Sequence, residues 1–324
     1  VANFMLNKRD RIIEYKDADE VTVKGSNRIP LLINSKWFYI DTDTDLSTGA
    51  NLDTGAVAAG KDYYVYACDN AGALVFLISL ASTYPAGYDA NTSRKIGGFH
   101  TLCVNVGTIA GHTLTDYTAN SILPQSVWDL KHRPRCEPAG MVWSDAAQVW
   151  VDIYLASGTG ASTVSVNGGT ISDTRDWMDF VDDFGAVKKR LLTDIEFQLI
   201  AAGSNEETNI VDSADPVTTG GHSDTGARRM ISNIGCEDCC GALNQWLITP
   251  SVKLDDGTVG GWIDLAGAKG SFYTFGTNGY ANTQLLAGGY WADGEHCGSR
   301  CRYAFLYRWG TNTPFGGRGC AEPQ

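Results

Sequence analysis

The sequence predicts an α+β protein in which short strands predominate and helices are few. Its 324 residues include 37 glycines, which implies many turns. Short runs rich in Val, Ile, Tyr and Phe alternate with clusters of Gly, Asp, Asn and Ser, as is typical of strands and their connections. Only two stretches, both within residues 176–203, repeat apolar residues at helical spacing. With 43% hydrophobic residues, the chain can bury a core and is long enough for two domains.

The first part of the chain reads as a β-rich module. Strands are predicted at EVTVKG, IPLLI, KWFYIDT, KDYYVYAC, ALVFLISLA and RKIGGFHTLCVNV, in that order. The pattern then loosens into Gly, Thr and Asn over residues 107–125. We therefore place a domain boundary near Pro124, which gives a β-rich N-terminal domain at residues 1–123 and a second domain at residues 124–324.

The second domain contains the predicted helices. A strand is expected at QVWVDIYL, and the helix of DWMDFVDDFGAVKKRL follows, with an apolar stripe made by Trp177, Phe180, Val181, Phe184 and Val187. A second helix begins with Thr193 and Glu196, which are spaced as a capping box, and it stops at Gly203.

Charge and hydropathy argue against a nucleic-acid-binding protein and against a membrane-spanning protein. The formal net charge is -12 and the pI is about 4.8, which argues against nucleic acid as the main partner because phosphate contacts need a basic face. The longest apolar run, ALVFLISLA, is far shorter than the roughly 20 residues of a membrane span. No signal peptide is recognisable, and the first residue, Val1, indicates a processed N-terminus. We expect a soluble chain.

The nine cysteines leave three possibilities open. They stand at positions 68, 103, 136, 236, 239, 240, 297, 301 and 320, and an odd number cannot be wholly paired within one chain. The runs CEDCC and CGSRC could together supply a four-thiolate zinc site. Buried reduced thiols are another possibility, but disulfides that connect the C-terminal loops are favoured.

No catalytic motif stands out. The five histidines are dispersed singly, the glycine clusters lack the residues of a phosphate loop, and no G-x-S-x-G run occurs. The DTDTD run lacks the later glycine and glutamate of a calcium loop. Asp182 and Asp183 are adjacent on a predicted helix and therefore point in different directions. We expect no enzymatic centre and no cofactor. We also expect a binding function that needs no metal.

Residues 288–319, GGYWADGEHCGSRCRYAFLYRWGTNTPFGGRG, follow neither strand nor helix periodicity. Pairs of glycines stand near both ends, where tight turns are expected. Tyr, Trp and Arg recur between them, and these residue types dominate binding hot spots. A contact surface and the core of a loop-rich domain are both compatible with this composition.

A series of blocks resembles one family in order. The blocks are AAGKDYYVYACDN, YPAGYDANTSRKIGGFH, SVWDLKHRPRCEPAGM, VWVDIYL, EFQLIAAGSNEET and the terminal run from GGYWADGEHCGSR to GGRGC. Together they resemble the variable proteins of diversity-generating retroelements, among them the phage tropism determinants. The resemblance covers most of the chain, from about Asp19 to Cys320.

The resemblance implies a C-type lectin-like domain from about Pro124 to the end, preceded by a small β-sandwich-like domain. It implies a receptor-binding protein of the virion tail tip or a cell surface, which binds a host-surface protein or another macromolecular ligand. It implies no nucleic-acid binding and no membrane insertion. Family members form trimers, but too few residues precede Asp19 to build their N-terminal β-prism, so a trimer is in doubt.

In this family, adenine-directed mutagenesis rewrites part of the C-terminal segment. The positions that the resemblance marks as variable and ligand-binding are Tyr290, Ala292, Asp293, Gly294, His296, Tyr303, Phe305, Leu306, Gly310, Asn312, Pro314 and Phe315. Each is a residue type that replacement of adenines in an AAC codon can reach, whereas Trp291, Glu295 and Trp309 cannot be reached. The marked residues should point outward, with an exposed aromatic patch at Tyr290, Tyr303, Phe305 and Phe315.

Other residues of this segment, next to the variable positions, are expected to hold its backbone by turns, packing and hydrogen bonds. This scaffold set comprises Gly288, Gly289, Trp291, Gly298, Ser299, Arg300, Gly316, Gly317, Arg318 and Gly319. One alternative function comes from another class: a copper oxidase like the formylglycine-generating enzymes, which share the lectin-like fold and use thiols. Cys297, Cys301 and Cys320 are the residues that keep this alternative open.

Overall fold

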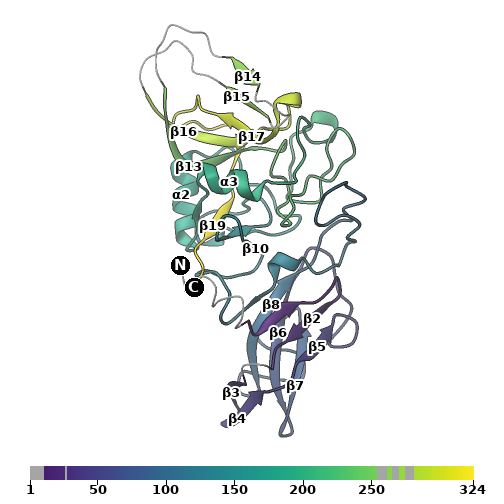
Figure 1. The fold of residues 1–324 in the computed structure, drawn as a ribbon. Coiled ribbons are helices and arrows are strands. Elements are labelled where there is room, and N and C mark those ends of the chain that lie inside the picture. Colours follow the sequence, from purple (N-terminus) through teal and green to yellow (C-terminus); the bar gives the residue numbers. More distant parts are fainter. Residues whose placement is uncertain (1–10, 26–27, 254–260, 265–269, 274–280) are drawn as a thin grey trace. The chain divides into compact units, whose positions relative to one another are not determined.

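The computed structural model describes residues 11–25, 28–253, 261–264, 270–273 and 281–324 (Figure 1). The chain divides into two compact units. The first contains the chain up to Asn105 together with Tyr117–Pro134 and Pro323–Gln324, and the second contains Val106–Asp116 and Arg135–Glu322. Pro124 falls inside a segment of the first unit, and the division into domains at this residue stays a prediction. Among the described residues, no helix combines the length and apolarity that a membrane span requires.

The described part of the first unit has three antiparallel sheets. Their strand orders are β1-β2-β5, β3-β4 and β7-β6-β8-β9. The strands are β1 (Ile13–Tyr15), β2 (Glu20–Val23), β3 (Ile29–Ile33), β4 (Lys36–Ile40), β5 (Thr44–Ser47), β6 (Asp62–Asn70), β7 (Ala73–Ser79), β8 (Ser93–His100) and β9 (Trp128–Asp129). This agrees with the predicted β-rich module, while its sandwich-like arrangement stays a prediction.

A buried aspartate connects the two ends of the first unit. The Asp129 carboxylate accepts hydrogen bonds from the amides of Ile12 and Ile13 at 2.8 and 3.1 Å. These isoleucines lie in an aliphatic core. The two amides thereby satisfy the requirement that a buried carboxylate be hydrogen-bonded.

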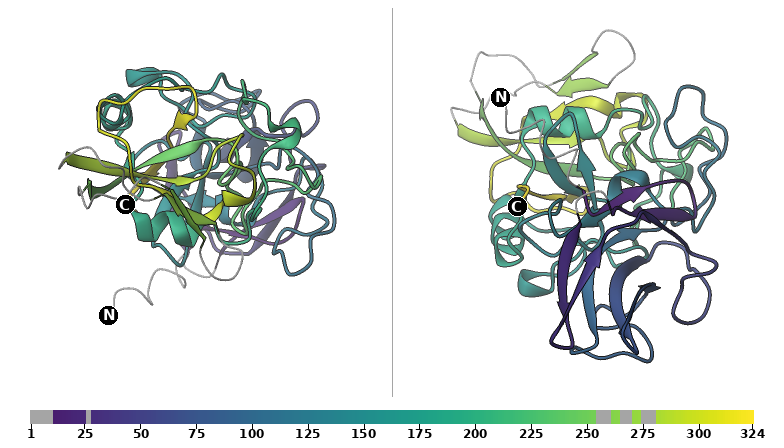
Figure 2. Two further views of the ribbon diagram at one scale, coloured as in Figure 1. Left: turned by 90° about the horizontal axis from the view of Figure 1, so that it is seen from above. Right: turned by 60° about the horizontal axis from the view of Figure 1, so that its bottom comes forward.

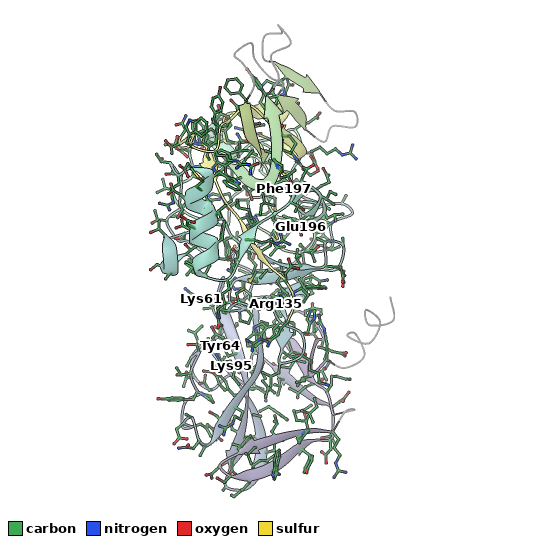
Figure 3. The ribbon with its side chains drawn as sticks, turned by 90° about the vertical axis from the view of Figure 1, so that its left-hand side faces the viewer. Lys61, Tyr64, Lys95, Arg135, Glu196 and Phe197 are labelled. Carbon is green, nitrogen blue, oxygen red and sulfur yellow. The ribbon has the colours of Figure 1, made fainter. Side chains whose placement is uncertain are left out.

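A cation–π contact joins the neighbouring strands β6 and β8. Lys95 Nζ lies 4.3 Å from the centre of the Tyr64 ring (Figure 3).

The second unit is built on two sheets in its described part. The four-stranded sheet has the order β10-β11-β19-β12 and the six-stranded sheet the order β14-β15-β17-β16-β13-β18; Figure 2 shows the fold from two further directions. The strands are β10 (Met141–Ser144), β11 (Val149–Asp152), β12 (Arg190–Leu191), β13 (Asn244–Lys253), β14 (Trp262–Asp264), β15 (Ser271–Tyr273), β16 (Ala281–Gly288), β17 (Gly298–Tyr303), β18 (Phe315–Gly316) and β19 (Gly319–Ala321).

Both predicted helices are present. Helix α2 (Trp177–Ala186) is shorter than the predicted run because Lys188 has a φ of 60° and the chain then enters β12. The apolar stripe buries Phe180 and Phe184 completely, in one cluster with Trp246 and Leu286 of the six-stranded sheet. With its strands and few helices, the fold agrees with the predicted α+β class.

Helix α3 (Asp194–Ile200) begins with the predicted capping box (Figure 3). The Thr193 hydroxyl accepts from the Glu196 amide at 3.2 Å, and the Glu196 carboxylate accepts from the Thr193 amide at 2.7 Å. Two amides at the start of the helix are thereby satisfied without tertiary help, which is why the sequence alone predicts where this helix begins.

We predict that Thr193→Ala lowers the free energy of unfolding by about 1 kcal/mol, because the Glu196 amide loses its acceptor. Urea denaturation of the variant measures this loss. The exposed Thr225 supplies the matched control, since Thr225→Ala removes the same atoms outside a cap. An equal loss in both variants would contradict a specific contribution of the cap.

Candidate functional site

Residues 288–319, called the C-terminal segment below, alternate between regular strands and loops. After β16 the segment forms a short 3-10 helix, η4 (Gly294–His296), and then strand β17. Strand β17 lies between β15 and β16 inside the six-stranded sheet, and β18 pairs with the other side of β13 (Figure 1). The connection of residues 304–314 is therefore held in a sheet at both ends.

The first glycine pair approaches other chain segments too closely for any side chain. Gly288 and Gly289 have φ angles of 98° and 78°, which favour glycine. A Cβ atom on Gly288 would lie 2.4 Å from the Cys239 carbonyl oxygen, and one on Gly289 would lie 2.9 Å from Cys297 Sγ. The Gly241 amide also donates to the Gly288 carbonyl at 3.1 Å. The backbone is consequently fixed where the segment begins.

The glycines at the other end are equally close to the core. A Cβ atom on Gly317 would lie 2.6 Å from Cδ1 of the buried Phe180 ring, and one on Gly319 would lie 2.6 Å from Asp152 Oδ2. The segment thus packs its bare backbone against helix α2 and strand β11. Larger residues here would have to displace core side chains.

Arg318 joins the segment to three other parts of the second unit. Its side chain is 1% exposed. Nε donates to Gln245 Oε1 at 3.0 Å, Nη1 donates to the carbonyls of Asp152 and Ile153 at 2.8 and 2.6 Å, and Nη2 donates to the carbonyl of Glu237. A buried guanidinium is tolerated because its donors are satisfied in this way.

Strand β17 is held by Ser299 and Arg302. The Glu206 carboxylate accepts from the amide and the hydroxyl of Ser299 at 3.0 and 2.8 Å. Arg302 is 6% exposed, donates to Asp194, and lies over the Phe197 ring at 5.2 Å. The expected anchor Arg300 is exposed instead, whereas Arg302 is buried. The pairing of β17 with β16 is irregular here, since Arg302 lies opposite Ala287 and Gly298 lies opposite Gly288, so regular alternation does not hold between the two arginines.

The twelve positions marked as variable differ in burial. Ala292 and Asn312 are exposed, and Phe315 is buried. The half-buried positions are Tyr290, Asp293, Gly294, His296, Tyr303, Phe305, Leu306, Gly310 and Pro314.

The expectation that Phe315 points outward is wrong. Phe315 pairs with Asn244 in the parallel β13–β18 contact and is only 7% exposed. Its ring centre lies 5.8 Å from that of the buried Trp246. The remaining aromatic residues of the expected patch are half-buried, and Tyr303 packs against the same core cluster. Burial accordingly raises the pKa of Tyr303 to about 12.

Five rings form a cluster that combines the C-terminal segment with the β14–β15 strand pair. Tyr303 stacks on Tyr273 at 5.2 Å, and His296 stacks on Trp262 at 4.6 Å with an angle of 9° between the rings. Phe305 meets Tyr273 and Tyr303 edge-on, each at 6.2 Å. We call Trp262, Tyr273, His296, Tyr303 and Phe305 the aromatic cluster. The sequence alone did not indicate Trp262 and Tyr273, which lie outside the C-terminal segment.

A second aromatic contact lies in the connection after β17. The Tyr307 and Trp309 rings are stacked at 5.0 Å, and Trp309 is 64% exposed. The Arg308 guanidinium lies 4.9 Å from the Trp177 ring centre, and its carbonyl accepts from the Trp177 amide at 3.0 Å. Trp309 therefore adds exposed aromatic surface beside positions marked as variable, although its own type is not reachable from an AAC codon.

The expectation of disulfides is wrong, because all nine cysteines are buried free thiols. Burial raises the pKa of the Cys297 and Cys301 thiols well above the ordinary range, so they stay protonated at neutral pH. Across the described residues, no three His, Cys, Asp or Glu side chains are grouped as metal ligands. The thiols contribute to both units as small apolar side chains.

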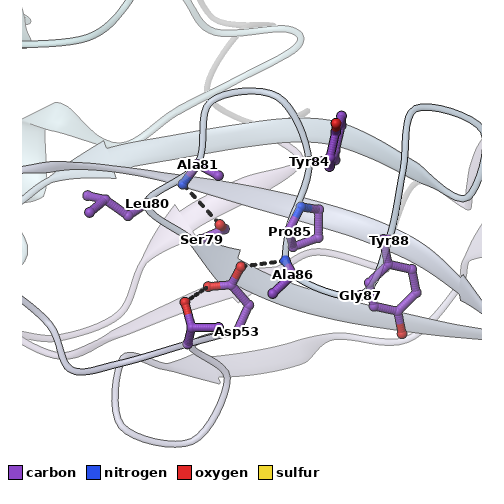
Figure 4. A pocket seen from close by; sticks show the side chains of 10 residues that line it. Asp53, Ser79, Leu80, Ala81, Tyr84, Pro85, Ala86, Gly87 and Tyr88 are labelled. Atoms are coloured by element: carbon purple, nitrogen blue, oxygen red, sulfur yellow. Dashed lines mark hydrogen bonds between the residues drawn. The ribbon is translucent and has the colours of Figure 1, made fainter.

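A hollow of about 500 Å³ in the first unit lies outside the C-terminal segment (Figure 4). It is lined by Asp53, Thr54 and residues from Ser79 to Tyr88, including the exposed Leu80 and Tyr84. Asp53 Oδ2 accepts from the Ala86 amide at 2.8 Å, and Ser79 Oγ accepts from the Ala81 amide at 3.0 Å. These polar atoms hold the loop over residues 80–88 in place.

Comparison with known proteins agrees with the sequence resemblance. Residues 12–129 match the family model described as Mtd second domain. A tail fiber receptor-binding protein of Bordetella phage BPP-1 is 29% identical over 242 aligned positions, and the match covers 66% of this chain and 59% of that relative. The chain thus spans about three fifths of the curated relative that it matches.

Solved structures extend the similarity to nearly the whole chain. The U1 variant of Major Tropism Determinant superposes with a TM-score of 0.75 at 26% identity, covering 98% of this chain and 84% of that structure. The M1 variant gives the same TM-score and coverage at 27% identity. The lectin-like fold implied by the resemblance agrees with these matches. Neither the phage protein nor these variants support the copper-oxidase alternative.

We predict that Gly317→Ala lowers the free energy of unfolding by about 1–3 kcal/mol, because its Cβ must displace the buried Phe180 ring. Gly185 is the matched control, since it lies in helix α2 with open space around its Cβ position. Gly185→Ala should be neutral or stabilising by up to about 1 kcal/mol. Thermal and urea unfolding of both variants tests the contrast, and equal effects would contradict the close approach.

We predict that Asp293→Asn stabilises the protein at neutral pH. Burial raises the Asp293 pKa to about 6, against an ordinary value of about 4. The folded state therefore binds this proton more tightly than the unfolded state, so the contribution to stability is present below about pH 4 and lost as the pH rises through 6. The variant should gain about 1–2 kcal/mol at pH 7, after allowance for solvent screening, and nothing near pH 4.

Urea denaturation of parent and variant at these two pH values measures the difference. The exposed Asp212, replaced by Asn, controls for the general effect of removing one carboxylate. A gain that is the same at both pH values would show that the Asp293 side chain is not the titrating group.

Proposed function

Because the chain is a relative of the major tropism determinants, we propose that it is a receptor-binding protein that displays a diversified surface on its C-terminal segment. It acts by binding and carries out no catalytic step. Its place is the tail tip of a virion, and its partner is a host-surface protein or another macromolecule on the host surface. The printed function of the phage relative, receptor binding by a tail fiber, supports this assignment.

The observation that carries the proposal is that the C-terminal segment contains both buried, closely packed residues and marked positions that are at least partly exposed. Gly288, Gly317 and Arg318 are buried and closely packed, whereas all the marked positions except Phe315 are at least partly exposed. Large-to-small changes in a core cost about 2–5 kcal/mol, against a total stability of about 5–15 kcal/mol. A surface that changes repeatedly must therefore keep its variation outside the core.

We further propose that several copies of the chain act together on the host surface. Linked copies convert modest affinities at single sites into strong overall attachment to a surface that carries many receptors. The half-buried aromatic positions supply contact area at a low cost in side-chain entropy.

Sequencing of sister copies of the coding segment tests the proposal. We expect substitutions to concentrate at the eleven marked positions other than Phe315, and a nearby near-repeat of the segment to carry adenines at the same codons. The codons of Gly288, Gly317 and Arg318 should stay unchanged, since they serve as internal controls. Substitutions spread evenly along the gene, or concentrated at the buried codons, would contradict the proposal.

A further inference from the structure

The strand register aligns three aromatic residues in one row. Trp262 of β14 pairs with Tyr273 of β15, and Tyr273 pairs with Tyr303 of β17. The same row continues through Leu286 of β16 to Trp246 of β13, which are 0% and 1% exposed. Directly opposed side chains lie on the same face of a sheet. The row therefore runs from the core to the half-buried Trp262 and Tyr273.

Three positions marked as variable contact the outer part of this row. Tyr303 stacks on Tyr273, His296 stacks on Trp262, and Phe305 meets Tyr273 edge-on. The Ser271 hydroxyl lies 2.9 Å from His296 Nδ1, which adds a hydrogen bond between β15 and the segment. Trp262 and Tyr273 lie outside residues 288–319, so mutagenesis of that segment leaves them unchanged.

We propose that Trp262 and Tyr273 are a fixed part of the binding surface, beside side chains that change. This proposal rests on the proposed function. It adds two residues that determine how tightly the chain binds its partner. The partner it fits is a protein surface that presents an apolar side chain to the aromatic cluster.

The chemistry of the cluster supports a protein partner. Its described contacts include ring faces and ring edges, together with the hydrogen bond between Ser271 and His296. Half-buried Trp and Tyr bring large apolar area with little loss of side-chain freedom, and they are enriched at the centres of protein interfaces. A constant aromatic pair gives every version of the segment some binding energy, so that variation modulates affinity without having to create all of it.

A displayed library tests both the proposed function and the role of Trp262 and Tyr273. The full chain is displayed with the eleven marked positions other than Phe315 randomised, and binders are selected on immobilised lysozyme as the probe. We expect binders of different sequence, and Trp262→Ala or Tyr273→Ala should weaken each of them at least about tenfold. If no binders emerge, the proposed function fails. If binders emerge and tolerate both changes, the fixed aromatic pair is refuted while the proposed function stands.

Two controls separate binding from folding. Trp37 is 62% exposed in the first unit, and Trp37→Ala should leave affinity unchanged. The melting temperature of each variant is measured, and Trp262→Phe and Tyr273→Phe keep an aromatic ring and should restore most of the affinity. A loss of affinity that follows melting temperature alone, without rescue by Phe, overturns the proposal. A selection on dextran completes the test, since dependence on Trp262 there and not on lysozyme would overturn the choice of a protein partner.

Discussion

The close approach of the backbone of the C-terminal segment to core atoms is the constraint on which the rest of the second unit depends. At Gly288 and Gly317 an added carbon would lie within 3 Å of a carbonyl oxygen or an aromatic ring. Arg318 adds hydrogen bonds to the carbonyls of β11 and of the residues before β13. A segment fixed in this way keeps its path while other side chains on it change, because its position is set by backbone contacts and a buried guanidinium.

The displayed surface is continuous with the core. One row of opposed residues leads from the buried Trp246 through Tyr303 to Trp262, and burial along it changes from complete at Trp246 to partial at Tyr303 and Trp262. The positions marked as variable differ in their tolerance to change. Phe315 belongs to the core, Tyr303 lies at its border, and Asn312 is exposed. Affinity and stability are therefore coupled at the border positions and independent at the outer ones.

Burial also sets the chemistry of the unit. Thiols that could have formed disulfides or held a metal are instead enclosed, and the pKa of Cys297 is raised well above its ordinary range. The same effect on Asp293 makes a carboxyl group of the proposed surface titrate near pH 6. Desolvation thus keeps the Cys297 thiol protonated, so that it packs as an apolar side chain within the core. At the border of the core it leaves Asp293 as a pH-sensitive group.

The sequence by itself determined the features that depend on local interactions. The capping box at Thr193 is satisfied within a few residues, and the apolar stripe of helix α2 is visible in its local spacing. The family pattern located the segment and its glycines. Tertiary structure alone decided that Phe315 is buried, that Arg302 and not Arg300 is the anchor, and that Trp262 and Tyr273 join the aromatic cluster. The burial of Phe315 and the placement of Tyr273 depend on parallel pairing of β18 with β13 and of β15 with β17. Such pairing joins strands far apart in the chain, and no local residue pattern specifies which face of a strand then meets the core.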